Sequence, residues 1–165
     1  MTLKIRLSRD DDRAAIHKVE QAAFGRDDEA KLVDKLIAAG DAVLELVAER
    51  DANIVGHILF TRLHVDSPNG AFDAVALAPL AVAPDAQGEG VGSALVGEAH
   101  RMLQDVGERL SVVLGEPGYY GRFGYRHSRA AGFDCDWQCK ELQALAWGDA
   151  PVAGRLVYAP AFLEL

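Results

Sequence analysis

The spacing of apolar residues changes several times along the 165-residue chain, and each change marks a predicted element. Residues 3–7 alternate between apolar and polar, which is typical of a strand. Residues 8–12 then supply capping and acidic side chains, which favour the start of a helix. The apolar face of this first helix would carry Ile16, Val19 and Ala23. A second helix is predicted over residues 28–40, with Leu32, Leu36 and Ile37 facing inward and Gly40 ending it.

Strands dominate the middle of the chain. Residues 42–66 have the pattern of a hairpin, with its turn at Asp51–Asn53. Residues 67–73 are dense in turn-forming types and predict a loop. Residues 75–82 are almost all apolar, as expected of a strand that is buried on both faces.

A β-α-β unit follows the hairpin. Residues 91–106 have helical spacing, and Leu110–Leu114 form a second buried strand. Because a helix joins the two strands, this strand should lie parallel to Val75–Val82. Residues 116–133 are aromatic and glycine-rich, which predicts a short helix and a loop, and residues 154–160 look like a final strand. The predicted inward face of the helix comprises Val91, Leu95, Ala99, Met102, Leu103 and Val106.

This order of elements predicts a mixed α/β protein of the α+β kind, in which helices cover both faces of the sheet. The length suits one domain, expected to span residues 1–165. The formal net charge is −8 and no basic cluster stands out, which argues against nucleic acid as a partner. Only two cysteines are present and no segment has the pattern of a signal peptide or membrane span, so the expected location is cytoplasmic, with no membrane partner.

Three glycines mark the junction between the strand over residues 75–82 and the following helix. Gly88, Gly90 and Gly92 would let the backbone approach a bulky ligand without a Cβ in the way. The first amides of a helix have no intrahelical partner, and the helix dipole adds partial positive charge there. The junction therefore favours a phosphate or diphosphate, although glycines after a strand can also serve a tight turn.

Three phosphate-binding patterns compete for these glycines. A P-loop needs a lysine after its last glycine, but Ser93 follows Gly92. The dinucleotide fingerprint needs a third glycine where Ser93 stands, and an early β-α-β unit. The pattern Q/R-x-x-G-x-G/A matches at every position of residues 87–92.

With this hexamer the sequence resembles the GNAT superfamily of N-acetyltransferases, in which the motif holds the pyrophosphate of acetyl-coenzyme A. The preceding LAPLAVAPDAQ looks like the family's fourth strand, and GYYGRFGYR looks like its FYxxxGF segment. In that segment Tyr120 takes the Tyr position and Gly124-Tyr125 the Gly-Phe positions. The likeness extends to about Phe133, and VLGEPGYYGRFGY looks like a subgroup of acetyltransferases whose substrates are poorly defined.

The resemblance implies a GNAT-like fold, which is a central, mostly antiparallel sheet with a splayed parallel strand pair and helices on both faces. Acetyl-CoA would be the co-substrate, and no metal is expected. Pro79 removes a hydrogen-bond donor from its strand, so a bulge there would free the backbone to pair with the pantetheine arm. The expected cofactor-binding residues are Leu80, Ala81, Val82, Gln87, Gly88, Glu89, Gly90, Val91, Gly92, Ser93, Tyr120 and Phe123.

The family's reaction is direct attack of an amine on the thioester within a ternary complex. A backbone N–H near Val82 would polarise the thioester carbonyl, and Tyr120 would donate a proton to the departing thiolate. From the residues alone, packing beside Tyr119 and Tyr125 is the favoured role of Tyr120, and the resemblance shifts the preference to catalysis. No residue stands out as the base for the amine, and a water relaying to a carboxylate would serve. Glu45 and Glu49 lie on a strand, where most glutamates are solvated, as the acidic residues 10–12 are also expected to be.

Two other functions fit the sequence less fully. The chain could be a non-catalytic module that binds and senses acyl-CoA, or a nucleotide-binding domain. The acceptor would be a small-molecule or peptide amine, expected to enter between the N-terminal helices and the loop over residues 66–73. The five histidines show no metal-ligand spacing. The apolar residues 156–165 could pair with a partner subunit, which predicts a homodimer as one assembly.

Overall fold

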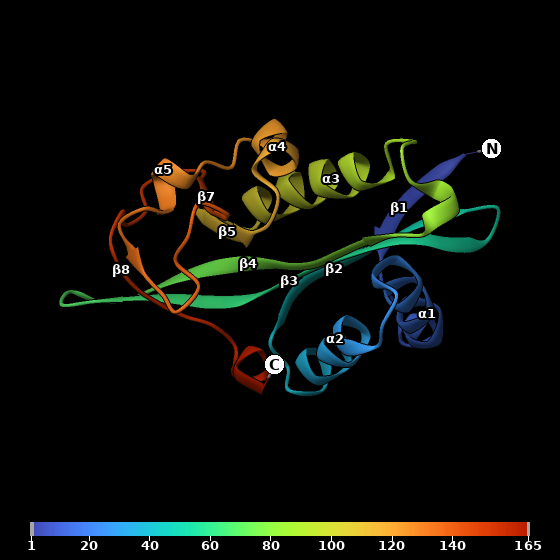
Figure 1. Cartoon of the computed structure of the whole chain (residues 1–165), viewed down its shortest axis with the longest axis horizontal. Helices are drawn as coiled ribbons and strands as arrows, with labels where there is room; N and C mark the ends of the chain where they lie inside the picture. Colours follow the sequence, from blue (N-terminus) through green and yellow to red (C-terminus); the bar gives the residue numbers. More distant parts are fainter. Residues whose placement is uncertain (1, 165) are drawn as a thin grey trace.

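The computed structural model describes residues 2–164. A twisted eight-stranded sheet runs through the molecule, and its main path follows the order β1-β2-β3-β4-β5-β7 (Figure 1). β8 pairs with β3 and β6 at one end of the sheet. The strands are β1 (Leu3–Leu7), β2 (Ala42–Arg50), β3 (Asn53–Ser67), β4 (Gly70–Val82), β5 (Leu110–Leu114), β6 (Phe133–Asp134), β7 (Leu142–Ala146) and β8 (Gly154–Val157).

Helices cover both faces of the sheet, as predicted. In Figure 1, α1 and α2 lie on one face, and α3, α4 and α5 lie on the other. Short 3₁₀ turns precede α1, precede α3, follow α4 and end the described chain. The helices are α1 (Arg13–Phe24), α2 (Asp28–Ala38), α3 (Val91–Asp105), α4 (Pro117–Tyr120) and α5 (His127–Ala130), and the 3₁₀ turns are Asp10–Asp12, Pro84–Ala86, Gly121–Phe123 and Pro160–Glu164.

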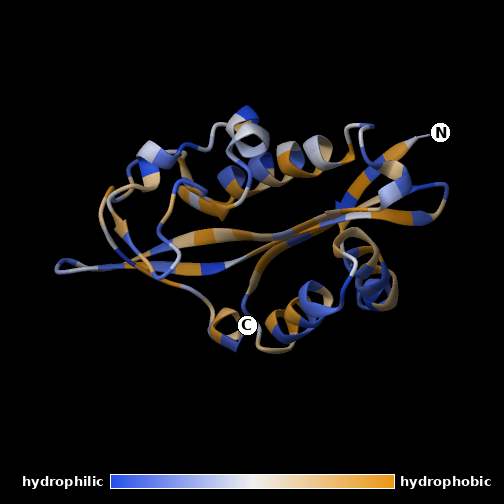
Figure 2. Ribbon diagram, in the orientation of Figure 1, coloured by the Kyte–Doolittle hydropathy of each residue, from blue (hydrophilic) through white to orange (hydrophobic). Residues whose placement is uncertain are grey.

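Each face of the sheet has its own apolar core. Ile16 and Leu36 from α1 and α2 pack with Leu59 on one face, whereas Leu95 from α3 packs with Ile58 on the other. Ile58 and Leu59 are neighbours on β3, so their alternation supplies both cores from one strand. Figure 2 shows apolar residues (orange) along the strands of the sheet and on the helices that cover it. Full burial of each such side chain contributes roughly 1.5–3 kcal/mol.

The β4–β5 pair is parallel, which confirms the predicted crossover through α3. Its register runs from Val75 opposite Ser111 to Leu77 opposite Val113. Pairing between the two strands stops at Leu77, although β4 continues to Val82 alongside β3. The two parallel strands therefore splay apart over the second half of β4.

Three expectations about local structure were wrong, and one strand was not predicted. Residues 67–73 do not form a long loop, because β3 continues to Ser67 and β4 begins at Gly70. Val106 is 74% exposed rather than inward, because it is the cap residue beyond the end of α3. The segment after residue 134 contains β7, which the sequence pattern missed. The acidic 3₁₀ turn is not fully solvated, since Asp12 is buried.

The apolar C-terminal segment packs largely against its own chain. Ala159, Ala161 and Phe162 are buried in the core that α1 and α2 share with the sheet. Leu163 is exposed, and residue 165 lies outside the described residues. The homodimer therefore stays a prediction, with less apolar surface to support it. Within residues 2–164, no helix combines the length and apolar character that a membrane crossing requires.

Candidate functional site

The splayed half of β4 begins with a bulge at Pro79. Leu77 pairs with Phe60 and Leu80 pairs with Ile58, so β4 has one residue more than β3 between these pairs. Beyond the bulge, β4 stays paired with β3 as far as Val82 but has no strand on its other side among the described residues. The bulge at proline confirms the expected break in the ladder.

The glycine junction has the geometry of an anion site. Gly88 and Gly90 have φ angles of +79° and +84°, a conformation that favours glycine, and open space surrounds the position of a Cβ at each. Gly92 is different, because a Cβ there would collide with the hydroxyl of Tyr119. α3 begins at Val91, and its first helical hydrogen bond joins Ala94 N–H to the Gly90 carbonyl at 3.0 Å. The amides of residues 91–93 therefore precede the helical ladder and could hold an anion.

A cleft of about 520 Å³ connects the splayed strand with the glycine junction. It is lined by Ala23, Phe24, Leu80, Ala81, Val82, Ala86, Gln87, Gly88, Gly90, Val91, Gly92, Ser93, Tyr119, Tyr120 and Arg122. Ten of the twelve predicted cofactor-binding residues are in this lining. Gln87 also donates from Nε2 to the Val82 carbonyl at 3.1 Å, which ties the junction to the end of β4.

The side chains of the other two predicted residues lie outside this lining. Glu89 accepts a hydrogen bond from Arg50 at 2.8 Å, so its carboxylate faces away from the cleft. Phe123 packs edge-on against Tyr119, with ring centroids 5.4 Å apart. Only the backbone of Glu89 remains a candidate for ligand binding, and Phe123 supports the tyrosine that lines the cleft.

Arg122 is a cleft residue that the sequence reasoning missed. Its Nη2 donates to Ser93 Oγ at 2.7 Å, and its guanidinium lies 5.2 Å from the centroid of the Tyr119 ring. The arginine thus places a full positive charge beside the first turn of α3, where the helix dipole has the same sign. Its position inside the aromatic segment GYYGRFGY was the available signal.

A second cavity, of about 720 Å³, adjoins the cleft. It lies between α1, α2, the splayed strands and the C-terminal segment, and it shares Phe24, Leu80 and Tyr120 with the cleft. Tyr120 thus stands where the two spaces meet. Burial raises the pKa of Tyr120 above its usual value, so the hydroxyl stays protonated at neutral pH.

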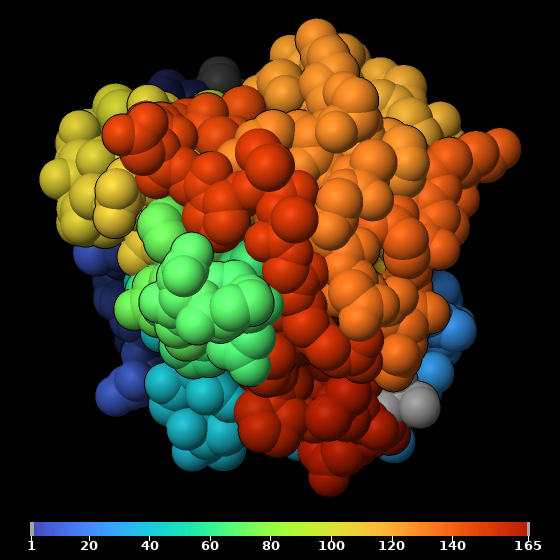
Figure 3. Space-filling view, turned by 90° about the vertical axis from the view of Figure 1, so that its left-hand side faces the viewer, coloured from blue at the N-terminus to red at the C-terminus, as the bar shows by residue number. Residues whose placement is uncertain are grey.

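The expected entrance for an acceptor is not where the cavity lies. The short hairpin connection after Ser67 lies at the far end of the β3–β4 ribbon from α1 in Figure 1, and it does not line the cavity. The C-terminal segment contributes Trp137, Tyr158 and Phe162 in its place. Figure 3 shows this segment (red) crossing the end of the molecule beside the β3–β4 hairpin (green).

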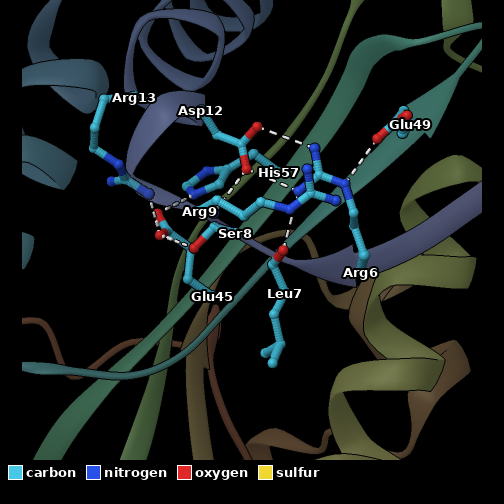
Figure 4. Close-up of polar contacts among 9 residues, drawn as sticks. All are labelled: Arg6, Leu7, Ser8, Arg9, Asp12, Arg13, Glu45, Glu49 and His57. Carbon is cyan, nitrogen blue, oxygen red and sulfur yellow. Dashed lines mark hydrogen bonds and ion pairs between the residues drawn. The ribbon is translucent and has the colours of Figure 1, made fainter.

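A buried ionic network lies between α1 and the strands β2 and β3 (Figure 4). His57 Nδ1 lies 2.6 Å from Glu20 Oε2, and His57 Nε2 lies 2.7 Å from Glu45 Oε2. Glu45 also accepts hydrogen bonds from Ser8 Oγ at 2.5 Å and from Arg13. The expectation that Glu45 is solvated was wrong, because it is 8% exposed.

The pKa values of the network depend on both burial and partners. Burial would lower the pKa of His57, but hydrogen bonds with Glu20 and Glu45 raise it above its usual value. Burial raises the pKa of Glu20 more strongly than its bond with His57 lowers it. Burial would also raise the pKa of Glu45, but its three hydrogen-bonded partners together lower it to about 2.

None of these network residues lines the cleft or the cavity. His57 is paired across the sheet with Ala81, so the network supports the splayed half of β4 from the adjacent strand. Arg6 on β1 forms a separate ion pair with Asp12, at 2.8 Å. Among residues 2–164, no group of three or more His, Cys, Asp or Glu side chains is placed to bind a metal ion.

Comparison with solved structures gives two close matches over nearly the whole chain. One is a GNAT family acetyltransferase from Brucella melitensis in complex with acetyl-CoA, with a TM-score of 0.83 and 34% identity, covering 98% of each chain. The other is YhbS from Escherichia coli in complex with CoA, with a TM-score of 0.89 and 30% identity, covering 98% of this chain and 92% of that one.

Sequence relatives agree with the structural matches. YhbS of Escherichia coli K12, an uncharacterized N-acetyltransferase, is 33% identical over 76% of this chain and 75% of its own length. The uncharacterized N-acetyltransferase YjhQ of the same strain is 41% identical over 69% of this chain, and the match spans 64% of YjhQ, just under two thirds. The acetyltransferase (GNAT) domain model matches residues 4–128. The chain therefore belongs to the GNAT acetyltransferase family.

Proposed function

We propose that the chain acts as one acetyltransferase domain that transfers the acetyl group of acetyl-CoA to a primary amine. The observation that carries this proposal is the meeting of two spaces at Tyr120. A cleft with an anion site at one end adjoins a separate cavity, and Tyr120 lines both. A donor and an acceptor held in these two spaces would meet directly, which suits transfer within a ternary complex.

Acetyl-CoA fits the cleft from the glycine junction to the splayed strand. Its diphosphate would sit at the amides of residues 91–93, with Arg122 as a counter-charge. Its pantetheine arm carries two amides, which would pair with the open edge of Leu80–Val82 as an added strand does. This placement brings the thioester toward Tyr120 and is supported by the cofactors in the two close structural matches.

The reaction follows from this placement. The neutral amine attacks the thioester carbon, so a C–N bond forms as the C–S bond breaks. Holding both reactants together makes the step effectively intramolecular. A backbone N–H near Val82 polarises the carbonyl, and the Tyr120 hydroxyl supplies a proton as negative charge develops on sulfur. The proton that the amine loses passes to solvent or to a nearby carboxylate.

Cofactor binding is tested by thermal unfolding with acetyl-CoA, CoA, NAD and ATP. Acetyl-CoA at 100 times its dissociation constant should stabilise the native state by about 2.7 kcal/mol. Gly90→Val should abolish this shift, because a β-branched side chain would fill the approach to the α3 amides. Gly107→Val is the matched control, since Gly107 has a φ of +89°, follows the other end of α3 and also has open space at its Cβ position. Stabilisation by NAD or ATP instead, or an unchanged acetyl-CoA shift in Gly90→Val, would contradict the proposal.

Tyr120→Phe separates catalysis from binding. The variant keeps the ring and removes only the proton donor, so kcat should fall by roughly ten- to a thousand-fold while the affinity for acetyl-CoA stays near wild type. Steady-state rates with an accepted amine and a binding isotherm for acetyl-CoA provide the two readouts. A wild-type rate would assign Tyr120 to packing. Tight acetyl-CoA binding without transfer to any amine would favour the non-catalytic acyl-CoA sensor.

A further inference from the structure

The cavity beside Tyr120 has walls that are mainly apolar and aromatic. Phe24, Leu32 and Leu114 line it together with three aromatic residues of the C-terminal part, Trp137, Tyr158 and Phe162. The Tyr158 ring packs against both of the others, with centroids 5.0 Å apart for Trp137–Tyr158 and 5.7 Å apart for Tyr158–Phe162. Such a wall gains free energy when it contacts an apolar group, in proportion to the area removed from water.

The charged residues in the lining are all acidic. Glu29, Glu116 and Asp136 line the cavity, and no lysine or arginine of the described chain does. Two of these carboxylates already have basic partners, because Arg26 holds both oxygens of Glu29 and Arg155 contacts Asp136 at 3.3 Å. Glu116 differs, since the one hydrogen bond that its carboxylate accepts within residues 2–164 is from the backbone N–H of Gly118, at 3.3 Å.

Glu116 also lies close to the point where the cavity meets the cleft. It is the N-cap residue of α4, and its carbonyl accepts the backbone N–H of Tyr120 at 3.0 Å. Gly115 before it packs so tightly on the Tyr120 ring that a Cβ would come within 2.5 Å of the ring. The free carboxylate and the tyrosine are therefore held by the same short turn.

We propose that this cavity binds a primary amine with an apolar or aromatic body, whose ammonium group pairs with Glu116. This substrate class rests on the acetyltransferase function proposed above. The aromatic wall holds the body of the amine, and Glu116 holds its cationic head next to Tyr120. A volume of about 720 Å³ is typical of a small-molecule site. An amine that carries a carboxylate is disfavoured, because every charged group in the lining is acidic.

A series of amines tests the substrate class through release of CoA from acetyl-CoA. Across n-propylamine, n-butylamine, n-pentylamine and n-hexylamine, kcat/KM should rise by about fourfold per added methylene until the cavity is filled. 2-Phenylethylamine should be a better acceptor than ethanolamine or putrescine, whose second polar end would be buried against the rings. Phenylalanine, which adds a carboxylate to the same body, should be poor.

Glu116→Gln tests the ammonium site. Glutamine keeps an acceptor for Gly118 N–H, so α4 should retain its cap. The KM for 2-phenylethylamine should rise by at least about tenfold, as expected when a charged partner becomes neutral, while the acetyl-CoA affinity stays unchanged. Glu98→Gln is the control, because Glu98 lies on α3, pairs with Arg101 and lines neither space.

The outcomes separate this inference from the function on which it rests. Chain-length dependence together with the Glu116→Gln effect supports the inference. Three results would overturn the substrate class if acetyl-CoA still binds, and they would leave the cofactor assignment intact. They are a preference for ethanolamine or putrescine, transfer to none of these amines, and an unchanged KM in Glu116→Gln. Absence of acetyl-CoA binding would overturn the proposed function itself.

Discussion

The pKa values of two histidines in the same protein shift in opposite directions. His57 lies on the α1 face of the sheet, with a carboxylate against each ring nitrogen. His100 lies on α3, where its Nε2 is 3.0 Å from the Tyr125 hydroxyl and its ring packs on Trp147. Burial lowers the pKa of His100 to about 4, whereas the two carboxylates raise the pKa of His57 despite its deeper burial. The charge of the partner, rather than the depth, decides the protonation of each ring.

The two clusters also differ in how much they depend on every member. Tyr125 bonds to both His100 and Ser111, and all three groups can stay neutral. The other cluster pairs two acidic side chains with two basic ones, and removing any one of the four leaves an unbalanced charge. These residues are Glu20, Glu45, His57 and Arg13. Its hydrogen bonding is incomplete as well, since Glu20 Oε1 and Arg13 Nη1 are buried without a partner in the described chain. The ionic cluster should therefore be the more sensitive to substitution.

The largest effect is expected from His57→Asn. The variant leaves two buried carboxylates without the imidazolium that bonds to both, so the free energy of unfolding should fall by about 3–5 kcal/mol. Urea unfolding measures the loss. His64→Asn is the control, because His64 is an exposed β3 histidine that also contacts a carboxylate, Asp73 at 2.9 Å. A loss below about 1 kcal/mol would mean that His57 contributes no more than a surface pair.

His57→Asn should also remove the alkaline limb of the stability profile. The pKa of His57 is raised in the folded state, so its contribution is fully present below the unfolded value of about 6.5 and is lost as pH rises through the folded value. The difference in unfolding free energy between wild type and variant should therefore shrink above pH 6.5. A difference that stays constant from pH 6 to 9 would show that His57 is not charged in the native protein.

A smaller loss is expected from Tyr125→Phe. This change leaves Ser111 and His100 without their shared hydroxyl but buries no charge, so the cost should be about 1–3 kcal/mol. Because Tyr125 lines neither the cleft nor the cavity, acetyl-CoA binding should be retained. A loss as large as that of His57→Asn would contradict the distinction between the neutral and the ionic cluster.

The smallest change at neutral pH is expected from His100→Phe. The pKa of His100 is lowered to about 4 in the folded protein, so the unfolded chain takes up a proton at this histidine first as pH falls. The free energy of unfolding of the wild-type protein should therefore decrease between about pH 6.5 and pH 4. The stability of the variant should lack this decrease at acidic pH, and its free energy of unfolding at pH 7 should be lower than that of the wild type by less than about 1.5 kcal/mol. Thermal melts of both proteins from pH 4 to 8 provide the measurement. Parallel profiles of melting temperature against pH would contradict the prediction.

The features that the sequence predicted well depend on residues that are close together in the chain. The glycine junction combines positive φ angles with a helix start, and both signals lie within a few residues of Gly90. The crossover between β4 and β5 followed from their apolar runs and the helix between them. Pro79 marked the bulge because proline cannot donate to a ladder.

What the sequence did not predict depends on contacts between distant segments. Glu45 alternates with apolar residues as a solvated strand residue does. Nothing near it in the sequence signals that α1 places Arg13 beside Glu45 and Glu20 beside His57. The cavity beside Tyr120 draws its walls from α1, α2, β4, β5 and two separate C-terminal segments, so no short motif marks it. β7 was missed because its five residues, LQALA, carry little β-branched or aromatic content.

The splay of β4 from β5 has a consequence for association as well as for binding. From Ala78 to Val82, one side of β4 is a strand edge without a neighbouring strand, and such edges invite pairing with other chains. This edge is recessed in the cleft behind the glycine junction and the Tyr119–Arg122 segment, rather than displayed at the rim of the sheet. A cleft of about 520 Å³ admits a slender ligand but is too small for another folded sheet. The fold thus keeps an unpaired strand available for recognition while shielding it from aggregation.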